Sequence, residues 1–142
     1  MQFIRARRDF GNPLPLQQAL EELRKEPLVK SVGMKMGSLI VETVKIIPKP
    51  ERCKGTFKIV ITFNLNRSIN VYIKRNEGTV KDFNLDGSRY HPHIWFSRNL
   101  HKNGICWGNC EELTDRLKRI GDVYWLVKLS LELLKNDYGH TT

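Results

Sequence analysis

The chain has 142 residues, of which 40% are hydrophobic, and it carries a formal net charge of +9 at pH 7. This length and apolar content predict one globular domain, residues 1–142, with a core that needs no disulfides. Three cysteines, with no secretory core after the basic amino terminus, favour free thiols in the cytoplasm. No run approaches the roughly 18 apolar residues that span a bilayer, which argues against a membrane partner.

The positive charge is spread along the chain and forms no long block. The basic residues also lack the interleaved aromatic residues of a recognisable nucleic-acid-binding motif. The distribution therefore argues against a nucleic acid as the partner, although it leaves that alternative open. An acidic protein would be attracted by the same field.

A short amphipathic helix is predicted near the amino terminus. It follows the proline-containing segment 12–15 and ends before Pro27, because proline cannot continue a helix. Its apolar positions recur with the spacing of one helical face and are Leu16, Ala19, Leu20 and Leu23.

The middle of the chain alternates between apolar and polar residues, as the strands of an antiparallel sheet do. The alternation is clearest in residues 57–65, which predicts one face on the core and one face in water. Residues 33–37 are expected to form a glycine-containing connector, and residues 75–78 a turn. The predicted strands cover residues 39–47, 57–65, 69–73 and 79–83. Their close spacing leaves no room for crossover helices, so a meander is expected.

Two helices are predicted in the carboxy-terminal third of the chain. Asn109 can cap the first in a capping box with Glu112, and Gly121 ends it. Asp122 can cap a final helix that runs to about Leu134. The apolar residues of this final helix cover more than one face, so we expect it to be buried against both the sheet and another helix.

The segment between the predicted sheet and these helices, from Arg89 to Cys110, holds most of the reactive side chains. It contains three of the four histidines and two of the three cysteines. A loop on a rigid frame is a common place for function, so we expect the chemistry here. The residues concerned are His91, His93, His101, Cys106 and Cys110.

This arrangement resembles the ubiquitin-conjugating enzymes, the UBC-like family. The motif residues are His91-Pro92-His93, where the family has His-Pro-Asn, and Asn103-Gly104-Ile105-Cys106-Trp107, where it has Gly-x-Ile-Cys-Leu. With the following Gly-Asn, the chain looks closer still to divergent bacterial and phage members. The resemblance implies an α+β UBC-like fold: an amino-terminal helix, a four-stranded antiparallel meander, an active-site loop and two carboxy-terminal helices.

The resemblance also implies an activity. Cys106 would accept the carboxy terminus of a ubiquitin-like protein as a thioester from an adenylating activating enzyme, and would pass it to an amine. A thiolate is both a good nucleophile and a good leaving group, so the transfer divides into two accessible steps. Arg98, Lys102 and the amino end of the following helix are expected to favour the thiolate. No cofactor is implied.

Further residues take roles from the same resemblance. His93 stands where the family has asparagine, and its ring N–H can donate to the developing oxyanion, although a purely structural role stays open. His91 and Pro92 would hold the backbone of the active-site loop. Asn109 is expected to be an active-site structural residue, as a helix cap in preference to a catalytic amide.

The basic amino terminus has two interpretations. In the resembled family, the region of the first helix is where the activating enzyme docks, which gives Arg5, Arg7 and Arg8 a role in partner binding. The same residues could instead belong to a disordered tail.

Other interpretations of the central segment also remain. A catalytically inactive UBC-like or RWD-like domain would act as a scaffold or adaptor, with Cys106 an inert thiol. Its histidines and cysteines could bind zinc, but they lack the close ligand pairs of structural zinc sites, so we expect no metal. Cys110 could resolve an oxidised Cys106 or simply pack, and the resemblance assigns no role to His101.

Overall fold

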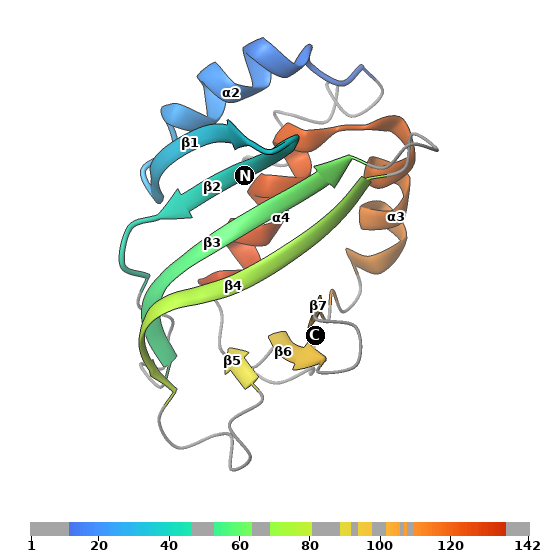
Figure 1. Cartoon of the computed structure of the whole chain (residues 1–142). Helices are drawn as coiled ribbons and strands as arrows, with labels where there is room; N and C mark the ends of the chain where they lie inside the picture. The colour runs from blue at the N-terminus through green and yellow to red at the C-terminus, as the bar shows by residue number, and fades with distance from the viewer. Residues whose placement is uncertain are drawn as a thin grey trace.

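The computed structural model describes residues 12–46, 53–63, 69–80, 89–91, 94–97, 102–105, 107 and 110–135. For residues 53–55, 74–80, 89–91, 94–97 and 102–104 it describes the backbone alone. The elements are α2 (Leu16–Arg24), β1 (Val29–Lys35), β2 (Ser38–Thr43), β3 (Cys53–Phe63), β4 (Ile69–Val80), β5 (Arg89–His91), β6 (Ile94–Ser97), β7 (Lys102–Ile105), α3 (Glu111–Ile120) and α4 (Val123–Leu134) (Figure 1).

The main sheet has four strands in the order β1-β2-β3-β4, and each strand is antiparallel to the next. In Figure 1, α4 lies behind this sheet with α3 beside it, and α2 runs along the β1 side. The α+β layout predicted from the sequence is confirmed, namely a helix, a four-stranded antiparallel sheet and two later helices.

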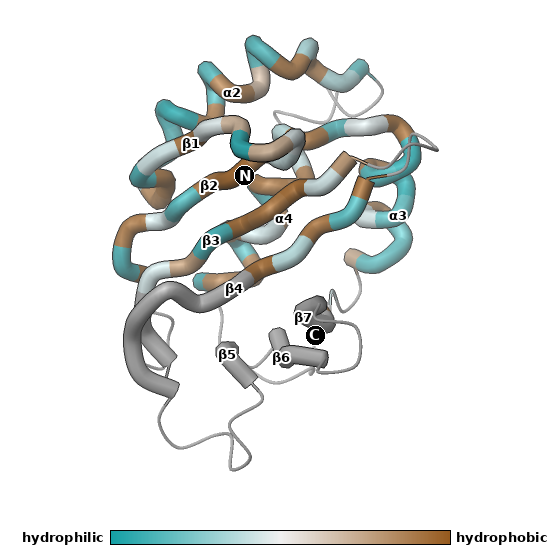
Figure 2. Tube along the Cα trace, in the orientation of Figure 1, coloured by the Kyte–Doolittle hydropathy of each residue, from teal (hydrophilic) through white to brown (hydrophobic). Residues whose placement is uncertain are grey.

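The core lies between one face of the main sheet and α4. Along β2, partly exposed residues alternate with buried ones, which include Leu39 and Val41. Figure 2 shows brown, hydrophobic stretches along β2 and β3. Each large apolar side chain that is fully buried contributes about 1.5–3 kcal/mol relative to exposure. The largest of them are Phe57, Leu23, Leu39, Ile59, Ile61, Ile73, Leu117, Leu126, Leu134 and Val41.

The carboxy-terminal helices follow the local signals in the sequence. Gly121 ends α3 in the left-handed region at φ 76°, and its neighbour Asp122 donates its backbone N–H to the carbonyl of Leu117 at 2.9 Å. The side chain of Asp122 then accepts the backbone N–H of Trp125 at 3.2 Å and caps α4. Both predicted boundaries are confirmed, as is the burial of α4 on more than one face.

The predicted connector at residues 33–37 is wrong, because most of it belongs to β1. The strand continues through Gly33 to Lys35, and the turn consists of Met36 and Gly37 alone, with φ 52° and 79°. Two positive φ values in succession are what a two-residue hairpin turn requires. The sequence did not indicate this strand because most of its residues are exposed or half-buried and do not alternate.

The predicted turn at residues 75–78 is also wrong, and Thr79 and Val80, which were predicted to begin a separate strand at 79–83, belong to β4; residues 81–83 lie outside the described residues. Strand β4 runs without interruption from Ile69 to Val80 and stays paired with β3 as far as Cys53. Thr56 pairs with Glu77 and Phe57 pairs with Arg75, so one extra residue of β4 is absorbed in a bulge. Strand β2 is shorter than predicted and ends at Thr43.

Over the described ranges, every helix is too short or too polar to cross a bilayer.

Candidate functional site

The segment predicted as an active-site loop contains three short strands, which is a correction to the sequence analysis. Strands β5, β6 and β7 form a second antiparallel sheet, and both β5 and β7 contact β4 of the main sheet (Figure 1). The run Ile94-Trp95-Phe96 is rich in residues that favour strands. It was missed because a run this short carries little periodicity.

The register of this second sheet aligns its strand ends. His91 pairs with Ile94, and Ile94 pairs with Ile105. Because neighbouring strands are antiparallel, β5 and β7 finish, and β6 starts, at the same end of the sheet. Neighbouring strands lie about 4.8 Å apart, so the backbones of His91 and Ile105 are about 10 Å apart across Ile94. The last residues of β5 and β7 therefore lie at one common end of the sheet.

Most of the predicted site residues lie outside the described residues. His91 is placed by its backbone at the end of β5, and its side chain is not described. The predicted residues outside the description are Arg5, Arg7, Arg8, Pro92, His93, His101, Cys106 and Asn109. The roles assigned to them stay predictions.

The residues on either side of Cys106 are anchored to the core. Ile105 ends β7, and both Ile105 and Trp107 are half-buried and pack against the hydrophobic core. The carbonyl of Trp107 accepts the backbone N–H of Cys110 at 3.1 Å, which makes a turn ahead of α3. Position 106 thus lies between two residues that are held by packing.

Helix α3 begins one residue later than predicted. Its N-cap is Cys110, which makes no side-chain cap hydrogen bond among the described residues, so the predicted capping box from Asn109 to Glu112 is wrong. Instead, the hydroxyl of Thr114 donates to the carbonyl of Cys110 at 2.8 Å. Cys110 itself is a half-buried free thiol, which fits a packing role.

The first turn of α3 also changes the expected electrostatics near Cys106. Glu111 and Glu112 are both exposed and both lie in this turn. Their negative charges offset the partial positive charge of the helix end. The amino end of α3 therefore favours a thiolate at Cys106 less than expected from the sequence. The basic residues Arg98 and Lys102 remain the residues predicted to stabilise that thiolate.

No group of three or more His, Cys, Asp or Glu side chains comes together in the part of the chain that the structure describes. Of the five side chains considered as zinc ligands, that part includes only Cys110.

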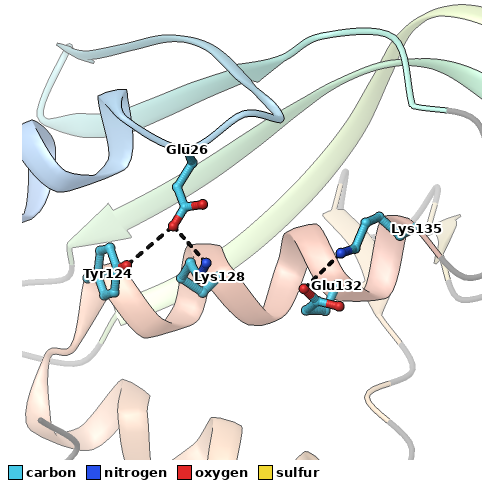
Figure 3. Close-up of polar contacts among 5 residues, drawn as sticks. All are labelled: Glu26, Tyr124, Lys128, Glu132 and Lys135. Carbon is cyan, nitrogen blue, oxygen red and sulfur yellow. Dashed lines mark hydrogen bonds and ion pairs between the residues drawn. The ribbon is translucent and has the colours of Figure 1, made fainter. Parts of the chain in front are cut away.

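A second polar cluster was not indicated by any sequence pattern. Glu26, in the connection between α2 and β1, accepts hydrogen bonds from Tyr124 and Lys128 of α4 (Figure 3). The separation of 102 residues between Glu26 and Lys128 explains why no local spacing revealed the pair. Only the packing of α4 beside this connection brings them together.

Comparison with known proteins adds no relative to this picture. No protein-family model, no curated protein and no solved structure matches the chain. A function for this protein therefore has to be argued from its own residues and geometry.

Proposed function

We propose that this protein is a conjugating enzyme for a ubiquitin-like protein, which it carries as a thioester on Cys106 and transfers to an amine. The observation that supports this proposal most directly is the register of the second sheet. His91, Ile94 and Ile105 lie in one row, so β5, which contains the first residue of the His-Pro-His motif, and β7, which precedes Cys106 in the sequence, finish at the same end of that sheet. This register supports the proposal because it aligns two strands that adjoin motifs separated in the sequence.

The proposed chemistry consists of two acyl transfers. The Cys106 thiolate attacks the thioester carbonyl of the charged activating enzyme, a C–S bond forms at Cys106, and the activating enzyme's thiolate leaves. An amine nitrogen then attacks the new thioester, an amide C–N bond forms, Cys106 leaves as the thiolate, and the amine proton passes to solvent. A nucleophile for such transfers benefits from a fixed position. Packing of Ile105 and Trp107 against the core supports a fixed position for residue 106.

His93 is the proposed oxyanion donor in both steps. Each attack places negative charge on the carbonyl oxygen, and a fixed N–H donor stabilises that charge. His91 and Pro92 hold the backbone that carries His93, and Asn109 is proposed as a structural residue of the same site in a role other than the N-cap of α3. The placement of His91 at a strand end supports a structural role for it.

The proposed partners are a ubiquitin-like protein and an adenylating activating enzyme, with the cytoplasm as the setting. Arg5, Arg7 and Arg8 form the proposed docking residues for the activating enzyme. A net charge of +9 supports attraction to an acidic partner surface.

One observation favours a second candidate, an inactive UBC-like or RWD-like domain that serves as a scaffold or adaptor. The acidic first turn of α3, with Glu111 and Glu112, disfavours a thiolate close to the helix start. A scaffold would keep the same α+β layout without using the thiol.

A charging assay distinguishes the two candidates. The protein is incubated with ATP, a ubiquitin-like modifier and its adenylating activating enzyme, and adducts are separated with and without reductant. The enzyme proposal predicts a reductant-sensitive adduct for the wild type and for the matched control Cys110→Ala, and none for Cys106→Ala. An uncharged wild type, in the presence of a charged activating enzyme, would favour the scaffold.

A further inference from the structure

A pocket of about 300 Å³ lies where the connection between α2 and β1 meets α4. Its apolar lining comes from Pro27 and Leu28 of the connection and from Leu131 of α4. Two ion pairs complete the lining, one between Glu26 and Lys128 and one between Glu132 and Lys135. A volume of this order lies at the lower end of the range for ligand sites.

Both protein donors to Glu26 reach the same carboxylate oxygen. Oε1 accepts from Nζ of Lys128 at 2.7 Å and from the hydroxyl of Tyr124 at 3.3 Å. Figure 3 shows the other oxygen, Oε2, pointing away from Tyr124 and Lys128. Among the described residues, none forms a hydrogen bond or ion pair to Oε2. Within the part of the chain that the structure describes, the carboxylate is therefore fixed in position with half of its acceptor capacity unused.

The charges of the pocket balance, so its unused hydrogen-bonding group decides the kind of ligand. Lys128 is held by Glu26, and only 12% of its side chain is exposed, compared with 18% for Glu26. Lys135 is held by Glu132 at 3.0 Å, and about half of each of these side chains is exposed. Because each lysine is already neutralised by a carboxylate, the strongest unused group in the partly buried part of the pocket is the acceptor Oε2 of Glu26.

We propose that this pocket binds a basic side chain, arginine or lysine, of a partner protein. The cationic head donates to Oε2 of Glu26, and the methylene stem packs on Leu28 and Leu131. Long basic side chains bind in this way because their stems are apolar and their heads are charged. A charge-assisted bond to a fixed, partly desolvated carboxylate is stronger than one at an open surface. The site does not depend on acyl transfer at Cys106.

The test uses a pair of probes that differ only in charge. The full chain, labelled with ¹⁵N, is titrated with N-acetyl-arginine amide and with its neutral analogue N-acetyl-citrulline amide. The arginine probe should cause saturable shifts at the backbone amides of Leu28 and Leu131, and the citrulline probe should bind at least about tenfold more weakly. Equal binding of the two probes, or no saturable shift with arginine, overturns the proposal. Saturable shifts at these amides with inorganic phosphate would also overturn it, because they would indicate an anion site.

A matched pair of variants locates the contact. Glu26→Gln should weaken arginine binding by about tenfold or more, because it removes the charge that the guanidinium meets. Glu22→Gln, in α2 and outside the pocket lining, should leave the affinity unchanged. Unaltered binding to a folded Glu26→Gln variant contradicts the proposal. If that variant does not fold, the comparison of the two probes on the wild type decides the question.

Discussion

The ammonium of Lys128 lies 2.7 Å from the carboxylate of Glu26, although 102 residues separate them in the chain. Both side chains are mostly buried, with 12% and 18% exposed. The pair joins the connection between α2 and β1 to the middle of α4 (Figure 3). It is the kind of contact for which removing one partner leaves a desolvated charge.

Lys128→Met should lower the free energy of unfolding by about 1–3 kcal/mol, because Glu26 keeps its charge and loses its closest donor. Urea unfolding measures the change. Lys135→Met is the matched control, since its pair with Glu132 is about half-exposed and contributes less than about 1 kcal/mol. Equal losses for the two variants would show that burial does not set the strength of the Glu26–Lys128 pair.

Two glycines offer a comparison in which backbone conformation is the main difference. No described atom lies within 4 Å of a Cβ placed on Gly33 or Gly121, but only Gly121 has a positive φ, at 76°. Gly121→Ala should therefore cost about 1–2 kcal/mol of stability, from the left-handed conformation alone. Gly33→Ala should be neutral or stabilise by up to about 1 kcal/mol, because alanine loses less entropy in a strand.

The urea midpoint of Gly121→Ala should fall. The midpoint of Gly33→Ala should stay unchanged or rise. The slope of each transition should stay unchanged. A loss for Gly33→Ala as large as that for Gly121→Ala would argue against the β1 backbone described here.

The N-cap of α4 is the third stability test. Asp122→Ala removes the acceptor for the backbone N–H of Trp125 and should cost about 1–2 kcal/mol. Asp122→Asn should retain most of the cap, because asparagine is an equally good N-cap residue. Asp115→Ala, on the exposed face of α3, serves as the control and should change stability by less than about 0.5 kcal/mol. A neutral Asp122→Ala would contradict the capping bond.

The sequence could predict those features that are determined by residues close together in the chain. Gly121 and Asp122 marked a helix end and a helix start because both act through bonds to residues within five positions. The bulge in β4 could not be predicted, since the Asn-Glu-Gly stretch is kept extended by pairing with β3. The strand through Gly33 is maintained in the same way by its pairing with β2.

The candidate site was predicted from motifs. The structure describes the strands that flank these motifs, but not the side chains proposed to react. The shared end of β5 and β7 depends on pairing through Ile94, which no local pattern in the loop-like segment indicated. The side chains of His93 and Cys106 lie outside the described residues, so their roles stay predictions. Glu26 and Lys128 were not predicted, because long-range packing alone joins them.

The role of His93 can be tested separately from that of Cys106. His93→Ala should still accept the modifier but discharge it to an amine on the order of a hundredfold more slowly, because one oxyanion donor is lost. His93→Asn should restore much of the rate, since its amide N–H can donate to the same oxygen. Single-turnover discharge of pre-charged protein measures both. Normal discharge by His93→Ala would leave His93 with a structural role only.

The most direct test of conjugation is to trap the modifier on residue 106 and identify the bond. Cys106→Ser is incubated with ATP, the modifier and the cognate activating enzyme, and the product is mapped by peptide mass spectrometry. Because an alkoxide leaves poorly, we expect a reductant-resistant oxyester on Ser at position 106, against a reductant-sensitive thioester on Cys106 in the wild type. Attachment of the modifier at Cys53, Cys110 or a lysine, with residue 106 unmodified in both proteins, would contradict the account.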